Sequence, residues 1–367
     1  MADTPLPPTP LRLGIVGANP ERGWARDTHV PALKALPGLE IHAVSARTRQ
    51  IADAALAAFG AKRAFADSLE LARDPDIDIV VVTVKVPEHR AIVLAALAAG
   101  KHVYCEWPLA VDVAEARELA EDAAKAGTHV AIGLQGAGSL AVEHAAQLVA
   151  SGAIGTPQRL RVVSTTNGWG AACPPNYGYL QDRTTGATLA SIAGGHTLAM
   201  IAAVIGPVEE ISACNSILNP QVSVIGTGEQ IARTCCDHML LHTRHTNGCV
   251  ANIEIVGGDT SPLTFELTGT KGSLSIHGQH PGGYQCAELT VTCATGAPQP
   301  ASEFPSLSQS AVNVARLYQR LENDIRDNTR HSADFADAVR LTEVLYAIEI
   351  SSDEGRAIAP EYGRESF

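Results

Sequence analysis

Four titratable side chains of this sequence are candidates for proton transfer in catalysis. His196 follows two glycines in GGHTL (194–198), and an unperturbed histidine titrates near pH ~6.5, so it can accept or donate a proton at neutral pH. Tyr177 and Tyr179 in PPNYGYLQD are further proton donors, and Lys85 follows an apolar, strand-like run. The structural alternatives are a histidine that fixes a helix start, a tyrosine pair that packs in a lid, and a solvated lysine at a strand end.

A second cluster of histidines and cysteines suggests a metal site, but its spacing argues against one. His238, His242 and His245 follow Cys235 and Cys236 in a strand-like run. Because side chains alternate between the faces of a strand, residues 238 and 242 lie on one face and residue 245 on the other. We therefore expect no metal in this protein.

The stretch GIVGANPERGWARDTHVPAL (14–33) has the features of a diphosphate-binding turn. An apolar run precedes it and a helix-like stretch follows it. The N-terminus of a helix directs free N–H groups and partial positive charge toward a bound anion, and glycines let a pyrophosphate approach the backbone. The loop is longer than the usual G-x-G-x-x-G, and an ordinary β–α turn is the alternative. The residues of this loop that we expect to bind a dinucleotide are Gly14, Gly17, Asn19, Arg22, Gly23 and Trp24.

The end of the second expected strand bears on which dinucleotide is bound. An acidic residue there would bind a ribose 2′-hydroxyl, but the sequence AVSARTR supplies Ser45, Arg47 and Arg49 instead. Arginine suits a 2′-phosphate, so NADP is favoured over NAD. Solvated arginines at a helix start are the alternative.

Two tryptophans and an adjacent pair of charged residues could shape a substrate site. Trp107, between Glu106 and Pro108, could stack on a nicotinamide or a sugar face, or narrow the pocket, and Trp169 in NGWGAACPP could form the opposite wall. Both could equally be core residues. Asp182 and Arg183 are candidates for binding hydroxyl or carboxylate groups of a substrate.

The elements that must position these residues alternate between strands and helices in the first third of the chain. We expect strands at 11–16, 40–45, 77–84, 101–105 and 129–133, separated by helices at 24–36, 48–59, 87–99 and 112–126. Such alternation predicts a doubly wound parallel sheet, a Rossmann domain over residues 11–134, after a disordered leader at 1–10.

Beyond residue 134 the pattern changes. A helix at 139–151 is followed by strand-like segments at 158–166, 208–217, 232–243, 249–256, 262–268, 273–277 and 287–293, with one helix near 186–205. Two helices, at 307–328 and 332–351, end the chain. The sequence thus predicts an α/β chain whose residues 135–367 form a substrate-binding and dimerisation domain with a large, mostly antiparallel open sheet and C-terminal helices that pack back.

Composition excludes several classes of partner and compartment. The 367 residues carry a formal net charge of −12 and no basic stripe, which disfavours nucleic acid. Apolar runs are shorter than the ~20 residues of a membrane span, and the N-terminus lacks the features of a secretory signal. Eight cysteines without a C-x-x-C spacing favour a reduced cytoplasmic location.

Several motifs together resemble the glucose–fructose oxidoreductase/inositol dehydrogenase/MocA family. They are AGKHVYCEWPLAVDVAEARELAEDA (99–123), DIDIVVVTVKVPEH (76–89), GLQGAGS (133–139), SGAIGTPQRLRV (152–162), GGHTL (194–198) and LTGTKGSLSI (267–276). The GWA and THVPAL segments, NGWG (167–170) and DHMLL (237–241) resemble one branch in particular, the fungal galactose-regulon repressor and its bacterial oxidoreductase-like relatives. The resemblance implies a Rossmann domain that binds NADP or NAD, followed by an open sheet that often forms the dimer interface.

The resemblance also implies roles for residues and a chemical departure. It implies cofactor contacts at Thr83, Val84, His89, Glu106, Trp107 and Gln135. The family's Glu-Lys-Pro triplet is Glu106-Trp107-Pro108 here, so the lysine that hydrogen-bonds the reacting oxygen is absent. The usual acidic residue four before His196 is Ile192, and the usual asparagine appears as Val86.

Two functions follow from these residues. One is an NAD(P)-dependent oxidoreductase that transfers a hydride to or from a small sugar-like hydroxyl, carbonyl or imine substrate, with His196 or a tyrosine handling the proton and a homodimer or homotetramer built through the C-terminal sheet. The other is a catalytically silent, cofactor-binding sensor that acts through a protein partner.

Overall fold

The computed structural model describes residues 9–294 and 298–362, which form two compact units. Of the described residues, the first unit comprises 9–110, Glu115–Gly133 and Phe304–Ala336, and the second comprises Val111–Ala114, 134–294, 298–303 and 337–362. Most of the expected leader, residues 1–8, lies outside the described residues.

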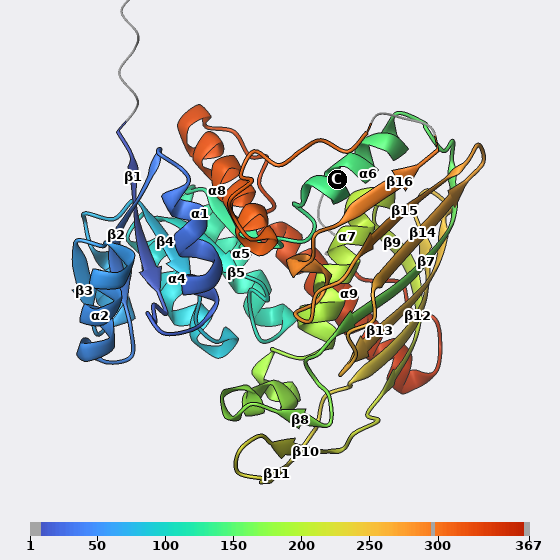
Figure 1. The fold of residues 1–367 in the computed structure, drawn as a ribbon, viewed down its shortest axis with the longest axis horizontal. Coiled ribbons are helices and arrows are strands. Elements are labelled where there is room, and N and C mark those ends of the chain that lie inside the picture. The colour runs from blue at the N-terminus through green and yellow to red at the C-terminus, as the bar shows by residue number, and fades with distance from the viewer. Residues whose placement is uncertain (1–8, 295–297, 363–367) are drawn as a thin grey trace, which may run out of the picture. The chain divides into compact units, whose positions relative to one another are not determined.

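The first unit is built on a six-stranded parallel sheet of order β3-β2-β1-β4-β5-β6 (Figure 1). The strands are β1 (Leu11–Val16), β2 (Leu39–Ser45), β3 (Arg63–Phe65), β4 (Ile79–Val82), β5 (His102–Glu106) and β6 (Val130–Gly133). Five of these were expected, and the doubly wound parallel sheet is confirmed. β3 was missed because three residues that are exposed or half-buried carry no periodic signal.

Helices cover this sheet, and their ends follow from local capping. They are the π-helical turn η1 (Ala25–His29), α1 (Val30–Lys34), α2 (Arg49–Phe59), α3 (Ser68–Arg73), the 3₁₀ turn η2 (Val86–Glu88), α4 (His89–Ala98) and α5 (Val113–Ala126). Thr48 caps α2 by accepting from the Ile51 N–H at 3.3 Å, and Gly60 ends it at φ +81°. The late helix α8 (Gln309–Asp327) belongs to this unit and buries Leu317, Tyr318 and Leu321 in its core.

The second unit contains a seven-stranded sheet of order β16-β15-β14-β7-β13-β12-β9. The strands are β7 (Pro157–Thr166), β9 (Val208–Ser216), β12 (His238–His245), β13 (Val250–Gly257), β14 (Leu263–Gly269), β15 (Ser273–Gly278) and β16 (Thr290–Cys293). Only β7 and β13 pair in parallel, so the mostly antiparallel sheet is confirmed. A three-stranded sheet joins β8 (Ala172–Cys173), β10 (Gln221–Val224) and β11 (Gln230–Ala232).

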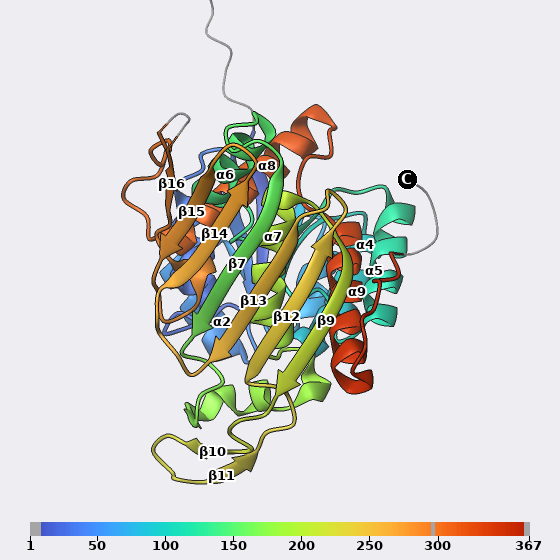
Figure 2. The same cartoon turned by 90° about the vertical axis from the view of Figure 1, so that its right-hand side faces the viewer.

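One face of the seven-stranded sheet is covered and the other carries none of the described helices (Figure 2). The covering elements include α6 (Leu140–Ala150), the π-helical turn η5 (Ala190–Gly194) and α7 (Gly195–Ile205). Helix α9 (Phe335–Glu354) is tied to β9, because Ser351 Oγ accepts from Ala213 N at 3.0 Å. β12 shows the resulting alternation: Met239 and Leu241 are buried, whereas Leu240 and His242 are exposed.

Three further observations bear on the expected classes of site and partner. No helix among residues 9–294 and 298–362 is long and apolar enough to cross a membrane. Within the same residues, no group of three histidine, cysteine or acidic side chains could hold a metal ion. None of the eight cysteines takes part in a disulfide in the described chain.

Candidate cofactor and substrate site

The turn after β1 has the geometry of a close backbone approach. Gly17 has φ +93°, a conformation that favours glycine, and both its N–H and that of Ala18 donate to the Ser45 carbonyl, at 3.1 and 2.9 Å. A Cβ on Gly17 would lie 3.0 Å from Thr83 Oγ1 and from Val84 Cγ1. The turn is therefore fixed between the carboxyl ends of β2 and β4, at the point where the strand order reverses.

The other predicted residues of the loop differ in backbone conformation, hydrogen bonding and packing. Gly23 has φ +105° with open space around it, and Asn19 Oδ1 accepts from Glu21 N at 2.9 Å. Trp24 precedes η1, and no side chain caps this helix. Gly14 lies inside β1, where a Cβ would meet Leu71 and Ile77 at 2.7 Å. The structure thus brings Gly17 to the turn, while Gly14 is needed for packing beneath α3.

The end of β2 offers one available arginine and one that is already engaged. Arg49 Nε lies 2.9 Å from Asp53 Oδ1, one helical turn along α2. Arg47 is exposed and makes no ion pair within the described residues, and Arg22 is likewise exposed. Ser45 is fully buried, with its Oγ 3.2 Å from that of Ser68. Of the arginines in AVSARTR, Arg47 is the one that makes no ion pair among the described residues.

The ends of β4 and β5 are held together by His89. Its Nε2 lies 3.0 Å from the Val84 carbonyl, and its Nδ1 lies 3.2 Å from the Leu109 carbonyl and 3.4 Å from Cys105 Sγ. Burial lowers the pKa of His89 and raises that of the Cys105 thiol, so both are neutral. Both ring nitrogens face a carbonyl oxygen, and a neutral imidazole can donate to only one of them. Thr83 Oγ1 donates to the Val16 carbonyl at 2.7 Å, which ties β4 to β1, and Lys85 is exposed at the start of η2.

Glu106 and Trp107 follow β5 at the same carboxyl edge. Trp107 is 6% exposed and precedes a cis proline, and the side chain of Glu106 is 14% exposed. Trp107 thus places a large buried ring at this edge, and its indole N–H does not titrate at neutral pH.

In the second unit, His196 lies near the start of α7 with an unused hydrogen-bonding atom. Its side chain is buried, and its Nδ1 has no hydrogen-bond partner. Burial lowers the pKa of His196 to about 4, so the imidazole is neutral at pH 7. Tyr284 holds the helix turn in place, because its hydroxyl donates to the His196 carbonyl. An isolated aromatic in a loop gives no sequence signal, and Tyr284 was missed.

Trp169 anchors the segment that carries the two tyrosines. It is a non-glycine residue at φ +58° and is 6% exposed, and its Nε1 donates to the Leu180 carbonyl at 2.9 Å. Tyr177 is exposed and Tyr179 half-buried on the adjoining 3₁₀ turn η3 (Pro175–Gln181), and burial raises the pKa of Tyr179. A left-handed conformation is uncommon outside glycine and concentrates at functional sites.

A buried ion pair, also missed from the sequence, supports this segment. Arg233 Nη1 lies 2.5 Å from Asp237 Oδ2, Arg233 Nε donates to Gln181 Oε1 at 2.9 Å, and Arg233 Nη2 donates to the Gly170 carbonyl at 2.6 Å. Both charged side chains are almost completely buried. Arg233 therefore connects the loop of Trp169 to the end of η3.

Asp182 and Arg183 lie directly after this segment. Asp182 Oδ1 accepts from Thr184 N at 2.9 Å, and this backbone hydrogen bond lowers the pKa of the carboxyl. Arg183 lines a hollow of about 190 Å³ with Thr234, Cys235, Cys236 and Glu349. Gln135 is buried in the turn before α6. The histidines considered as metal ligands diverge, since His238 contacts Glu254 at 2.9 Å and His245 is buried on the other face.

Comparison with known proteins assigns both parts of the chain. Residues 11–134 match the model of the oxidoreductase family with an NAD-binding Rossmann fold, and residues 141–278 match the Gal80p C-terminal domain. The chain belongs to the glucose–fructose oxidoreductase/inositol dehydrogenase/MocA family.

Similar proteins include both a dehydrogenase and a regulator. Dehydrogenase aclE of Aspergillus oryzae is 29% identical over 96% of this chain and 99% of its own length. The galactose/lactose metabolism regulatory protein GAL80 of Kluyveromyces lactis is 32% identical over 73% of this chain and 64% of its own length. A super-repressor mutant of Gal80p from Saccharomyces cerevisiae shares the fold, with a TM-score of 0.86 and 22% identity, over 98% of this chain and 100% of its own.

Within this oxidoreductase family, the chain departs from the expected proton-handling residues at three described positions. Trp107 and Val86 are buried apolar residues, and Ile192 lies one helical turn before His196 in η5. His196 is therefore the titratable group that remains of that set in the second unit.

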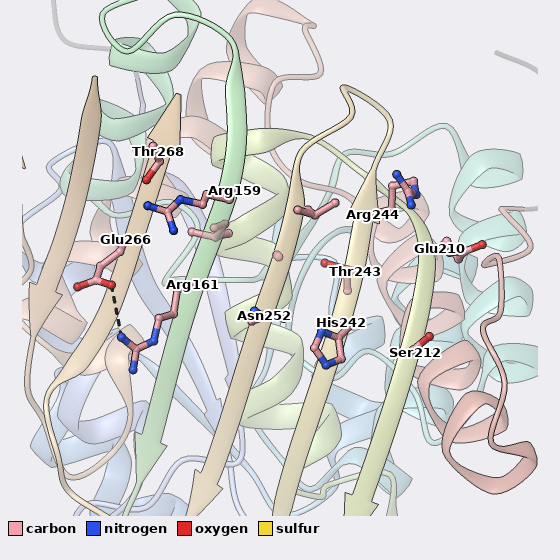
Figure 3. A pocket seen from close by; sticks show the side chains of 13 residues that line it. Arg159, Arg161, Glu210, Ser212, His242, Thr243, Arg244, Asn252, Glu266 and Thr268 are labelled. Carbon is pink, nitrogen blue, oxygen red and sulfur yellow. Dashed lines mark ion pairs between the residues drawn. The ribbon is translucent and has the colours of Figure 1, made fainter. Parts of the chain in front are cut away.

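The exposed face of the seven-stranded sheet forms a broad hollow of about 610 Å³ with charges of both signs (Figure 3). Arg159 and Arg161 project from β7, Glu266 from β14, and Glu210 from β9. Arg161 lies 3.7 Å from Glu266, and both side chains are largely exposed. This face is open to a partner of mixed charge.

Proposed function

We propose that the protein is an NAD(P)-dependent oxidoreductase that transfers a hydride between a nicotinamide cofactor and a small sugar-like hydroxyl, carbonyl or imine substrate. The observation that carries this proposal is the Gly17 turn at the switch point of a 3-2-1-4-5-6 parallel sheet, where ligands of doubly wound folds bind. The residues present fit a dinucleotide, because Gly17 and Gly23 both take left-handed φ angles, Gly23 has open space around it, and no side chain caps the helix start at Trp24.

The chain's own residues would bind, orient and manage one proton. Gly17, Gly23 and the first turn of η1 bind the diphosphate, and Arg47 binds a 2′-phosphate, which favours NADP over NAD. A bound nicotinamide supplies the hydride acceptor or donor. His196, neutral at pH 7, accepts the hydroxyl proton of a substrate undergoing oxidation, and Tyr177 or Tyr179 is the alternative proton carrier. Asn19, Thr83 and Glu106 are further contacts that we propose for the cofactor.

The second candidate function is a cofactor-binding regulator. It is favoured by the match of residues 141–278 to the Gal80p C-terminal domain and by Trp107 in place of lysine. A screen of sugars, sugar acids, ketones and imines with NADP⁺ or NADPH, read at the nicotinamide absorbance band, separates the two. Turnover supports the enzyme, whereas saturable cofactor binding without turnover of any compound supports the regulator.

We also propose that a second copy of the chain covers the exposed face of the seven-stranded sheet, giving a homodimer or a homotetramer. Leu240 and Val250 are 44% and 45% exposed there, among charges of both signs. Leu240→Arg should shift the sedimentation coefficient to that of a monomer. Ile225→Arg is the matched control, since Ile225 is 58% exposed in a turn outside this sheet and should leave the assembly intact.

A further inference from the structure

Buried aromatic and polar side chains of the first unit form a chain of contacts that ends at Glu106. The His29 side chain is fully buried, with its Nδ1 2.6 Å from the Tyr318 hydroxyl and its Nε2 3.1 Å from Glu106 Oε1. Tyr104 packs against both aromatic partners, with ring centroids 5.5 Å from His29 and 4.6 Å from Tyr318. Neither His29 nor Tyr318 was among the residues predicted from sequence.

Three elements far apart in sequence meet in this cluster. His29 ends η1, the π-helical turn that begins just after the Gly17–Gly23 loop. Glu106 ends β5, and Tyr318 lies on α8, 289 residues after His29. π-Helical turns are rare and occur frequently at functional sites. The same short helix therefore carries both the expected diphosphate-binding end and the group that contacts Glu106.

The His29 ring lies between the Tyr318 hydroxyl and the Glu106 carboxyl group. Burial, together with the negative charge of Glu106, raises the pKa of Tyr318 well above its usual value, so its hydroxyl keeps its proton. In the tautomer that accepts from this hydroxyl at Nδ1, the imidazole carries its hydrogen on Nε2, which lies 3.1 Å from Glu106 Oε1. This contact lies at ion-pair distance without the alignment of a hydrogen bond, so its attraction is electrostatic.

We propose that His29 is a positioning residue that holds the Glu106 carboxylate at the carboxyl end of β5, ready to accept hydrogen bonds from the hydroxyl or amide groups of a bound nicotinamide dinucleotide. Tyr318, in turn, holds His29. This inference rests on the proposed cofactor site. The proposed role accounts for the burial of His29, which follows the diphosphate loop, against Glu106 at the end of β5. Through Tyr318, it also gives α8 a role in cofactor affinity.

Two amide substitutions of His29 separate positioning from simple packing. Glutamine places an N–H₂ where Nε2 lies and can still contact Glu106, whereas asparagine places its polar atoms near Nδ1 and can contact only Tyr318. NADPH and NADH affinities are measured by fluorescence titration of the full chain. We expect His29→Gln to stay within about threefold of the unmodified protein and His29→Asn to weaken binding about tenfold. The double variant His29→Asn/Glu106→Gln should lose no more cofactor affinity than whichever of the two single variants binds the cofactor less tightly. Both substitutions act on one contact, so their effects should not add.

Two more variants complete the test. Tyr318→Phe removes one hydroxyl and should weaken cofactor binding several-fold, with a native circular dichroism spectrum. His42→Asn is the matched control, because His42 contacts Glu40 at 3.2 Å on β2, and it should bind cofactor like the unmodified protein. Equal affinities of His29→Gln and His29→Asn would overturn the inference, as would a Tyr318→Phe variant that binds normally. An unmodified protein that binds neither NADPH nor NADH would instead overturn the proposed function, and this inference with it.

Discussion

Arg233 and Asp237 form an ion pair whose side chains are 0% and 1% exposed, with Nη1 2.5 Å from Oδ2. The carboxylate also accepts from the Leu218 and Asn219 N–H groups, and the guanidinium also donates to Gln181 and Gly170. All three guanidinium nitrogens and both carboxylate oxygens therefore have hydrogen-bond partners, and these contacts tie several loops together. A buried pair of this kind contributes little net energy when complete, but breaking it leaves an uncompensated charge in the interior.

We therefore predict that Arg233→Met lowers the free energy of unfolding by about 3–5 kcal/mol. Hydrogen exchange at η3, which carries Tyr177 and Tyr179, should accelerate as well, because Gln181 loses its partner. Urea unfolding measures the first effect and exchange mass spectrometry the second. Arg161→Met is the control, since its exposed contact with Glu266 at 3.7 Å should be worth under about 1 kcal/mol. Equal unfolding midpoints for the two variants would contradict the prediction.

Cofactor preference should depend on Arg47 and not on Arg49. Arg49 is engaged by Asp53 at 2.9 Å, while Arg47 is exposed at the end of β2. A charge-assisted contact to a 2′-phosphate is worth about 1.4 kcal/mol, or tenfold in the dissociation constant. Arg47→Ala should raise the Kd for NADPH about tenfold and leave the Kd for NADH nearly unchanged, as measured by fluorescence titration. If Arg49→Ala produces the same selective loss, the arginines have been assigned wrongly.

The role proposed for His196 predicts both a rate effect and a pH profile. His196→Ala should reduce kcat by about 10²–10⁴ while the Kd for NADPH changes less than threefold, because the residue handles a proton and does not bind the dinucleotide. Since burial lowers the pKa of His196 to about 4, the neutral imidazole persists in mildly acidic solution. The oxidation rate should therefore remain level from pH 8 to about 5 and fall only as the pH approaches 4. A loss of rate between pH 7 and 6 that disappears in the variant would refute this assignment.

Much of the fold follows from local sequence patterns because those patterns report burial. The apolar strands β1 and β4 were located closely, since each buries side chains with the period of its own geometry. The strand expected at 232–243 is β12, which runs from His238 to His245, so its end was located better than its start. β3 and α3, with three and six residues, are too short for a period to emerge. Helix α8 packs in the first unit although it lies near the end of the chain. Its amphipathic sequence fits either unit equally well, so the sequence does not predict which unit it joins.

The sequence predicts a residue of the candidate site only where the role of that residue depends on its own backbone conformation and its neighbours in the chain. Gly17 is needed by its own backbone conformation, and the strand before it and the helix after it indicate as much. Gly14 lies three residues earlier with no such need, and only the side chains of Leu71 and Ile77 show what it is for. Arg233 pairs with Asp237 four positions along the chain, but its contacts with Gln181 and Gly170, and that of Tyr318 with His29, join residues dozens to hundreds of positions apart. The left-handed conformation of Trp169 is likewise imposed by its surroundings. Nothing in their immediate sequence indicates those partners.

Stability should fall in mild acid because of His102, whose ring centroid is 5.3 Å from that of His129. Burial, followed by repulsion from His129, lowers the pKa of His102 to about 4. Above pH ~6.5 both the native and unfolded forms are neutral, so the group has no effect. As the pH falls from ~6.5 toward 4, His102 binds a proton in the unfolded chain but stays neutral in the native protein, so the free energy of unfolding decreases. At pH 5 this costs about 1 kcal/mol, after discounting for a ring that is only partly buried.

His102→Asn isolates this contribution. The asparagine Oδ1 takes the place of Nδ1, which accepts from the His129 N–H at 2.9 Å, so the local hydrogen bond is kept while the titrating group is removed. Urea unfolding at pH 7.5 should give nearly equal stabilities for the variant and the unmodified protein. At pH 5.0 the variant should be the more stable by about 1 kcal/mol. His277→Asn, at an exposed position of β15, is the matched control and should leave the stability toward urea nearly unchanged at either pH. An identical pH dependence of stability in His102→Asn and the unmodified chain would show that His102 does not lower the stability in acid.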